Sequence, residues 1–172
     1  MATSIVLTII GDDRPGIVES LSRTLSNHDG NWVQSSMSRM AGQFAGILLA
    51  TVPDGEVAAC LQALERLEQE GLTIITHAIS LPPEEAPART WRLELVGNDH
   101  PGIVRDITSV LKQHGVNVEE LETEVESASM AGGDLFRARA VLRVPDASDV
   151  QALLDGIEDI AQDLMVDMQQ QD

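Results

Sequence analysis

The sequence predicts an α+β fold in which one small unit, an antiparallel sheet with two helices on one face, occurs twice in tandem. Three observations lead to this prediction. Strand-like and helix-like patterns follow one another in the same order in both halves, an eight-residue motif is repeated, and a proline-rich stretch separates the halves. The repeat carries the most weight, because duplicated sequences fold into the same elements.

The repeated motif is Gly11–Val18, which returns as Gly97–Val104 at an offset of 86 residues (97 − 11 = 86). The offset is the same between Asn31 and Asn117 (117 − 31 = 86), so the two copies align without a gap over this region. Each motif follows a strand-like run and opens a helical pattern. The motif therefore marks the same strand-to-helix turn in both units.

The first copy opens with Ile5–Ile10, a β-branched run that predicts a buried strand. A helical pattern follows the motif. Asp13 is expected to cap this helix, with Arg14 and Pro15 in its first turn. The residues expected on its core-facing stripe are Ile17, Val18, Leu21 and Leu25.

The remaining elements repeat the order strand, helix, strand, strand, helix, strand. The first copy is completed by strands at Asn31–Met40, Phe44–Val52 and Leu72–Ile79 and by a helix that is striped from Val57 to Leu67 and ends at Gly71. In the second copy we expect strands at Trp91–Val96, Asn117–Glu126, Leu135–Val144 and Asp163–Met168, and a hairpin turn at Met130–Gly133. Its first helix is expected to start at Ile103 and to end at His114–Gly115, and its second helix to cover Val150–Ile157.

This order is typical of a ferredoxin-like β-α-β-β-α-β sandwich, a two-layer unit with one four-stranded antiparallel sheet. We expect one such domain at residues 1–81 and a second at 90–172. Residues 82–89, which include the run Pro82–Pro87, are expected to form a linker, since clustered prolines favour neither helix nor strand.

The sheet faces without helices are predicted to differ. In the second unit the alternation places Glu120, Glu122, Glu124 and Glu126 opposite Arg137, Arg139 and Arg143, so we expect cross-strand ion pairs on a hydrated face. The matching face of the first unit has no charge. Its expected members are Val6, Thr8, Gln34, Ser36, Ser38, Ala45, Ile47 and Leu49. An uncharged face of this kind suggests cover by a second chain, in a homodimer, although a weakly polar free surface is the alternative.

Composition narrows the function. The 172 residues carry a formal net charge of −17, with two Trp, two Phe and no Tyr. Direct nucleic-acid binding is therefore not expected, and nor is binding to an anionic membrane. No signal peptide or membrane-spanning run is visible, so a cytoplasmic protein is expected. Cys60 lies on an apolar helical stripe, the histidines lack metal-ligand spacing and no catalytic motif occurs, so we expect neither an enzyme nor a cofactor.

The repeated turn offers chemistry for a small zwitterion. Its glycine lets a ligand approach the main chain, and the amides that open the helix can bind a carboxylate. Asp13 or Asp99 can attract an ammonium group, and Asn31 or Asn117 can donate and accept hydrogen bonds. The alternative is structural, because the same residue types also start helices and form turns without any ligand.

The order of elements and the run Asp13–Val18 resemble the ACT domain, an amino-acid-sensing regulatory module. In that family ligands bind where two units meet, between the turn after the first strand and the start of the second strand. By that resemblance the site residues are Asp13, Arg14, Pro15, Gly16, Ile17 and Asn31 in the first unit, and Asp99, His100, Pro101, Gly102, Ile103 and Asn117 in the second.

Two ACT units in an acidic chain, with Ser38–Ala41 followed by Phe44, resemble regulators of glycine cleavage. That resemblance implies glycine as the ligand and a basic DNA-binding activator as the protein partner. An ACT-type regulatory subunit that confers feedback control on an enzyme of amino-acid metabolism is the alternative. The same turn also resembles the start of formyltetrahydrofolate hydrolases, but no catalytic domain of theirs is visible here.

Overall fold

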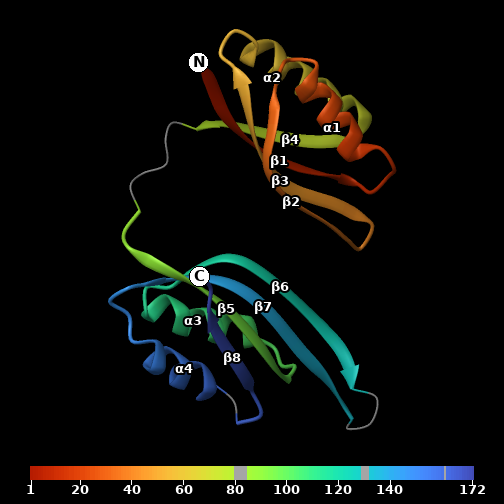
Figure 1. Ribbon diagram of the computed structural model, residues 1–172. Coiled ribbons are helices and arrows are strands. Elements are labelled where there is room, and N and C mark those ends of the chain that lie inside the picture. The colour runs from red at the N-terminus through yellow and green to blue at the C-terminus, as the bar shows by residue number, and fades with distance from the viewer. Residues whose placement is uncertain (80–84, 129–131, 161) are drawn as a thin grey trace. The chain divides into compact units, whose positions relative to one another are not determined.

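The computed structural model describes residues 1–79, 85–128, 132–160 and 162–172. The chain divides into unit 1, Met1–Pro83, and unit 2, Glu84–Asp172, which are described separately here (Figure 1). Two sequence predictions fall partly outside the described residues. These are the linker, at positions 82–84, and the second hairpin turn, at positions 130 and 131.

Unit 1 contains the predicted order of elements, with a 3-10 turn η1 added after the second helix. The sheet order is β2-β3-β1-β4, and every neighbouring pair is antiparallel. Its elements are β1 (Ala2–Asp12), α1 (Ile17–Ser26), β2 (Asn31–Met40), β3 (Gln43–Pro53), α2 (Val57–Arg66), η1 (Leu67–Glu70) and β4 (Leu72–Ile79).

Unit 2 repeats this topology in the order β6-β7-β5-β8, again with antiparallel neighbours. The predicted α+β class, with two tandem ferredoxin-like sandwiches, is therefore confirmed. The elements of unit 2 are β5 (Ala88–Asn98), α3 (Ile103–Gln113), β6 (Asn117–Ala128), β7 (Gly133–Pro145), α4 (Val150–Glu158) and β8 (Met165–Gln170).

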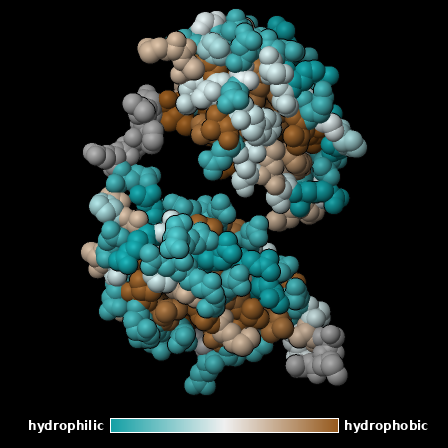
Figure 2. Space-filling model, viewed as in Figure 1, coloured by the Kyte–Doolittle hydropathy of each residue, from teal (hydrophilic) through white to brown (hydrophobic). Residues whose placement is uncertain are grey.

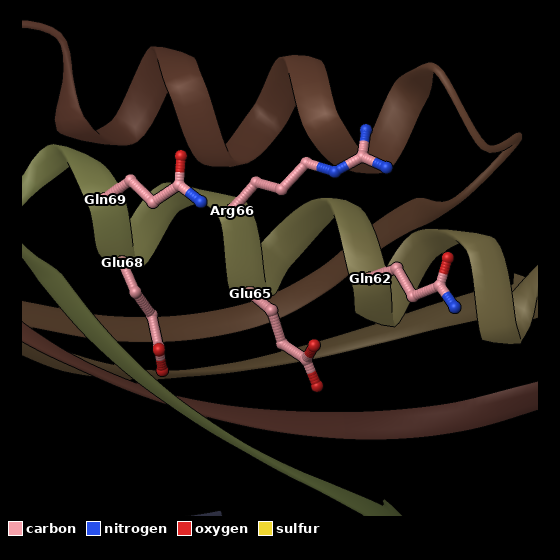
Figure 3. Close-up of a pocket in the computed structure, with 5 residues that line it drawn as sticks. All are labelled: Gln62, Glu65, Arg66, Glu68 and Gln69. Carbon is pink, nitrogen blue, oxygen red and sulfur yellow. The ribbon is translucent and has the colours of Figure 1, made fainter.

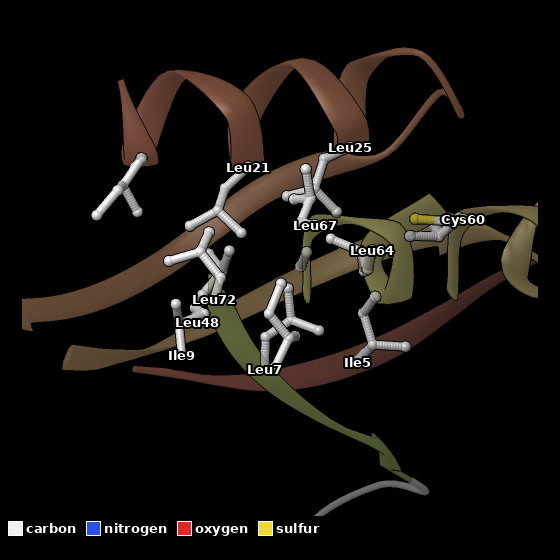
Figure 4. Packing of buried hydrophobic residues seen from close by; sticks show 14 residues of the cluster. Ile5, Leu7, Ile9, Leu21, Leu25, Leu48, Cys60, Leu64, Leu67 and Leu72 are labelled. Atoms are coloured by element: carbon white, nitrogen blue, oxygen red, sulfur yellow. The ribbon is translucent and has the colours of Figure 1, made fainter. Parts of the chain in front are cut away.

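The core of each unit lies between its sheet and its two helices. In unit 1, Leu7 of β1, Leu21 of α1 and Leu64 of α2 are fully buried and meet in this layer (Figure 4). The predicted helical stripe is too wide at one position. Val18 and its repeat equivalent Val104 are 47% and 39% exposed. Each follows a buried isoleucine, and consecutive side chains on a helix point about 100° apart, so the valine turns away from the core.

The helix-free face of unit 2 carries the predicted cross-strand ion pairs only in part. Arg137 lies 3.6 Å from both Glu124 and Glu126. Arg143 instead contacts Glu119 and Glu85, because an irregularity between Val118 and Glu120 shifts the register of β6. Within the described part of the chain, Arg139 forms no ion pair.

The corresponding face of unit 1 is uncharged, as its sequence predicts. Ile47 and Ile75 are more than half exposed there, and Ile10 is nearly so. They flank Thr8 of β1, which is paired with Ile47 on one side and Ile75 on the other. The register adds two ionisable side chains to this face, His77 of β4 and, at its rim, Asp12 of β1, which accepts a hydrogen bond from Gln43.

Candidate functional site

Both repeated turns end in a glycine that reverses the chain before the helix begins. Gly16 and Gly102 are the residues that precede α1 and α3, and their φ angles are +93° and +90°. This left-handed conformation is strained for residues that have a Cβ atom. The helices therefore start at Ile17 and Ile103, one residue beyond each glycine.

The prediction that Asp13 caps the first helix is wrong. No side chain accepts a hydrogen bond from the first turn of α1 or of α3, and Arg14 and Pro15 lie before the helix rather than in its first turn. The helix α4 shows the contrast, since Asp149 accepts hydrogen bonds from the amides of Gln151 and Ala152. A left-handed glycine separates Asp13 from the amides that a capping side chain would reach.

The uncapped first turn has consequences for binding. Amides at the start of a helix lack partners within the helix and lie at its positive end, where anions bind favourably. Space is available in unit 1, where a Cβ atom placed on Gly16 would meet nothing within 4 Å. On Gly102 a Cβ atom would lie 3.1 Å from the guanidinium of Arg105, so the positive charge of this side chain lies beside the second turn.

The aspartate of the first turn is engaged with the β2–β3 hairpin. Its carboxylate lies 2.6 Å from Nε of Arg39, and its backbone amide donates to the carbonyl of Gly42. Beside it, Gln43 donates to the carboxylate of Asp12 at 2.6 Å. Sequence reasoning missed Arg39 as a site residue, because only the strand register places it beside Asp13.

The second turn is arranged differently. The backbone amide of Asp99 donates to the carbonyl of Asp134, but its exposed carboxylate forms no ion pair with any residue that the structure describes. Arg105 contacts the neighbouring Asp106 at 2.9 Å. The repeat equivalent of Arg105 in unit 1 is Glu19 (105 − 86 = 19), so this cation belongs to the second turn.

The residue directly after the aspartate also differs between the two turns, being Arg14 in unit 1 and His100 in unit 2. Arg14 donates to the carbonyl oxygen of Glu70 at 3.0 Å and lies 3.4 Å from its carboxylate, which ties the turn to η1. In unit 2 the ring of His100 instead contacts the carbonyl oxygen of Pro101 at 3.1 Å. His100 thus makes a local contact and leaves the second turn less constrained.

The two asparagines do not lie beside the turns of their own units. Asn31 pairs with Thr51, whereas the turn leaves β1 opposite Gln43. Eight residues of β3 (51 − 43 = 8) separate these points, which corresponds to roughly 27 Å along an antiparallel strand. Asn117 is displaced in the same way, since it pairs with Arg143 at the far end of β7. Within one unit, the turn and the asparagine cannot line the same pocket.

Other polar and reactive groups are less suited to a site. A surface hollow on α2 and η1 is lined by side chains that spread along the outer helix surface without converging (Figure 3). Cys60 is fully buried, and burial raises the pKa of its thiol, with a further contribution from Glu56. Among the described residues no cluster of His, Cys, Asp or Glu is arranged to hold a metal ion, and no helix is long and apolar enough to cross a membrane.

Comparison with known families and curated proteins gives two results. Family models described as ACT domain match residues 3–77 and residues 88–162. The chain is also 22% identical over 147 residues to the glycine cleavage system transcriptional repressor of Escherichia coli (strain K12). That match covers 84% of this chain and 77% of the relative.

Two solved structures share the fold over the full length. An unknown protein from Galdieria sulphuraria is 31% identical, with a TM-score of 0.88 and complete coverage of both chains. A putative glycine cleavage system transcriptional repressor is 17% identical, with a TM-score of 0.69 and 99% coverage of both chains. At that identity the second likeness concerns the fold alone.

Proposed function

The chain belongs to the ACT-domain family, and on that premise we propose that it regulates transcription of glycine cleavage in response to a small free amino acid. The similarity to the repressor of Escherichia coli supports this direction. The net charge of −17 opposes contact with DNA, so the regulator acts through a basic DNA-binding activator. It performs no catalysis of its own.

The primary ligand site in this proposal is the second turn. The carboxylate of Asp99, which has no ion-pair partner among the described residues, binds the ammonium group. The amides of Val104 and Arg105, with the guanidinium of Arg105 that also contacts Asp106, bind the carboxylate. The observation that carries this assignment is the difference between the two aspartates. Asp13 is already neutralised by Arg39 at 2.6 Å, so an ammonium group gains less there.

Each asparagine contributes to binding only from a neighbouring copy of its unit, since it lies at the far end of its own sheet. A homodimer supplies such a copy. We place the dimer contact on the uncharged face of unit 1, around Ile10, Ile47 and Ile75, because two chains of charge −17 can approach there without bringing like charges together. Hydropathy colouring shows hydrophobic and intermediate residues over the strands of unit 1 (Figure 2).

Calorimetric titration of the full chain with the standard amino acids tests the ligand. Glycine is titrated first, because the Escherichia coli relative is a glycine cleavage system transcriptional repressor. We expect Asp99→Asn to abolish the binding heat and the matched variant Asp13→Asn to retain most of it. The absence of heat with every amino acid would overturn the sensing function, and equal losses in both variants would overturn the assignment to the second turn.

The dimer is tested by sedimentation. The wild-type chain is expected to dimerise, whereas Ile47→Lys places a charge at the centre of the uncharged face and is expected to give monomers. Val104→Lys is the control, since it adds the same charge on an exposed helix position of unit 2. A wild-type chain that stays monomeric at high concentration contradicts the proposed contact.

The class of partner is tested by affinity capture with and without glycine. The proposal predicts capture of a basic DNA-binding protein, in an amount that changes when glycine is added. Capture of an enzyme of amino-acid metabolism in its place would support the alternative, a feedback-regulatory subunit.

A further inference from the structure

The outermost strand of unit 2, β6, has two rows of side chains of opposite character. It forms one edge of the sheet order β6-β7-β5-β8, so one side of the strand has no neighbour in its sheet. On the helix-free face its row consists of Glu120, Glu122, Glu124 and Glu126. On the helix side the row is Leu121, Thr123 and Val125, and Leu121 and Val125 are 47% and 53% exposed.

An apolar groove lies between this second row and α3. Leu121 and Thr123 of β6, Val104 and Thr108 of α3 and Ala138 of β7 are among the residues that line it. All the accessible lining of the groove is apolar. Its volume is only about 20 Å³, so a partner segment along the edge of β6 packs apolar side chains on the exposed Leu121 and Val125 rather than inside the groove.

The repeat places a larger side chain at the matching position of unit 1. In unit 1, Met37 of β2 lies over Gly46 of β3, so closely that a Cβ atom on Gly46 would lie 2.5 Å from the Met37 side chain. The equivalent residues are Thr123 (37 + 86 = 123) and Ala138 (46 + 92 = 138). Threonine is shorter than methionine and fills less of the space beside the helix.

Charge decides what kind of segment fits this edge. If β6 paired antiparallel with a second copy of itself about Thr123, Glu122 would face the partner's Glu124, and like charges directly opposite destabilise a sheet. The equivalent open-face row on β2 is Gln34, Ser36 and Ser38, which carries no such penalty. The edge of β6 thus disfavours a second copy of this chain and favours a basic segment.

Part of the glutamate row is available for such a segment. Arg137 already contacts Glu124 and Glu126 at 3.6 Å. Glu120 and Glu122 take part in no ion pair with the residues that the structure describes. They share a hollow with Arg92 and Arg139, and Arg139 is the register partner of Glu122, so a new cation reaches them from the free edge of β6.

We propose that β6 binds an extended segment of a protein partner in which basic and apolar side chains alternate. The segment adds a strand to the sheet through main-chain hydrogen bonds. Its basic side chains meet Glu120 and Glu122, and its apolar side chains pack on Leu121 and Val125. The proposal rests on the proposed function only for the partner class, a basic regulator, and requires no amino-acid ligand.

A labelled peptide tests the proposal on the full chain. The probe is a peptide of about eight residues in which Lys and Val alternate, a length typical of a strand. Its binding is followed by fluorescence anisotropy. We expect the double variant Glu120→Gln/Glu122→Gln to weaken peptide binding by about tenfold, because it loses two cross-strand charge pairs with the peptide. The matched control is Glu65→Gln/Glu68→Gln, which removes the same charge from the outer side of α2 and η1.

A second variant and a second peptide separate this mode from general attraction. The double variant Leu121→Ser/Val125→Ser removes the exposed apolar row without changing the charge and is expected to weaken binding. A peptide of the same composition with its lysines and valines in separate blocks is expected to bind more weakly. Equal binding of both peptides, equal losses in the two Glu→Gln double variants, or unchanged binding to Leu121→Ser/Val125→Ser would overturn the proposal. Because no amino acid is added, failure here leaves the calorimetric test of the sensing function unaffected.

Discussion

The left-handed glycine of the first turn gives a prediction whose size follows from the structure. Gly16 has a φ angle of +93° and open space around the position of a Cβ atom, so Gly16→Ala introduces backbone strain without a clash. A left-handed conformation costs a residue with a Cβ atom about 1–2 kcal/mol. We therefore expect unit 1 to lose about 1 kcal/mol of unfolding free energy, after the alanine has offset part of this cost by reducing the entropy of the unfolded chain.

Urea unfolding followed by tryptophan fluorescence measures this loss. Each unit has one tryptophan, Trp32 and Trp91, so a Trp91→Phe background reports on unit 1 alone. The control is Gly55→Ala, because Gly55 also has open space around it but no positive φ. This variant is expected to be neutral or slightly stabilising. If Gly16→Ala and Gly55→Ala have the same unfolding free energy, the strain attributed to the turn does not exist.

Three further predictions concern the core, a helix cap and the cysteine. Leu7→Ala is expected to cost about 2–5 kcal/mol of unfolding free energy, because Leu7 is fully buried, whereas Ile47→Ala on the exposed face is expected to cost far less in the monomer. Asp149→Ala is expected to lower the unfolding free energy by about 1 kcal/mol, because it removes the side-chain cap of α4. Asp13→Ala removes no cap, so the amides of α1 are expected to keep their protection from hydrogen exchange. A loss of that protection would contradict the uncapped start of α1. Burial raises the pKa of the Cys60 thiol, so it is expected to react slowly with iodoacetamide at pH 8 in the folded chain and quickly in urea. The thiol ionises more readily in the unfolded chain, so its contribution to the unfolding free energy is complete below its ordinary pKa of 9.0 and declines as the pH rises above that value. Unfolding free energies measured at several pH values for the wild type and for Cys60→Ala check this decline.

The limits of sequence reasoning are clearest at the repeated turn. Its position between strand and helix could be predicted, because a β-branched run, a Pro-Gly pair and a helical stripe follow one another in both copies. The capping role of Asp13 could not be judged in this way, since Asp-x-Pro-Gly is compatible with either a capped helix or a left-handed glycine. The backbone angle of Gly16 decided between them.

Spacing along the chain also gave no indication that a turn and its asparagine lie far apart. Asn31 follows Asp13 by 18 residues (31 − 13 = 18), but the intervening helix returns the chain to the opposite end of the sheet. Likewise, the pairing of Arg39 with Asp13 depends on where the β2–β3 hairpin ends. These are contacts between elements, which hydrophobic periodicity does not encode.

The sequence by itself determined the duplicated α+β architecture, the uncharged face of unit 1 and the acidic row of β6, because each follows from a local period of side chains along the chain. Only the tertiary structure decided which aspartate is neutralised, which helix starts lack a side-chain cap and how closely Met37 packs over Gly46. Those features depend on register and on the packing of one element against another, so two nearly identical turn sequences acquire different surroundings.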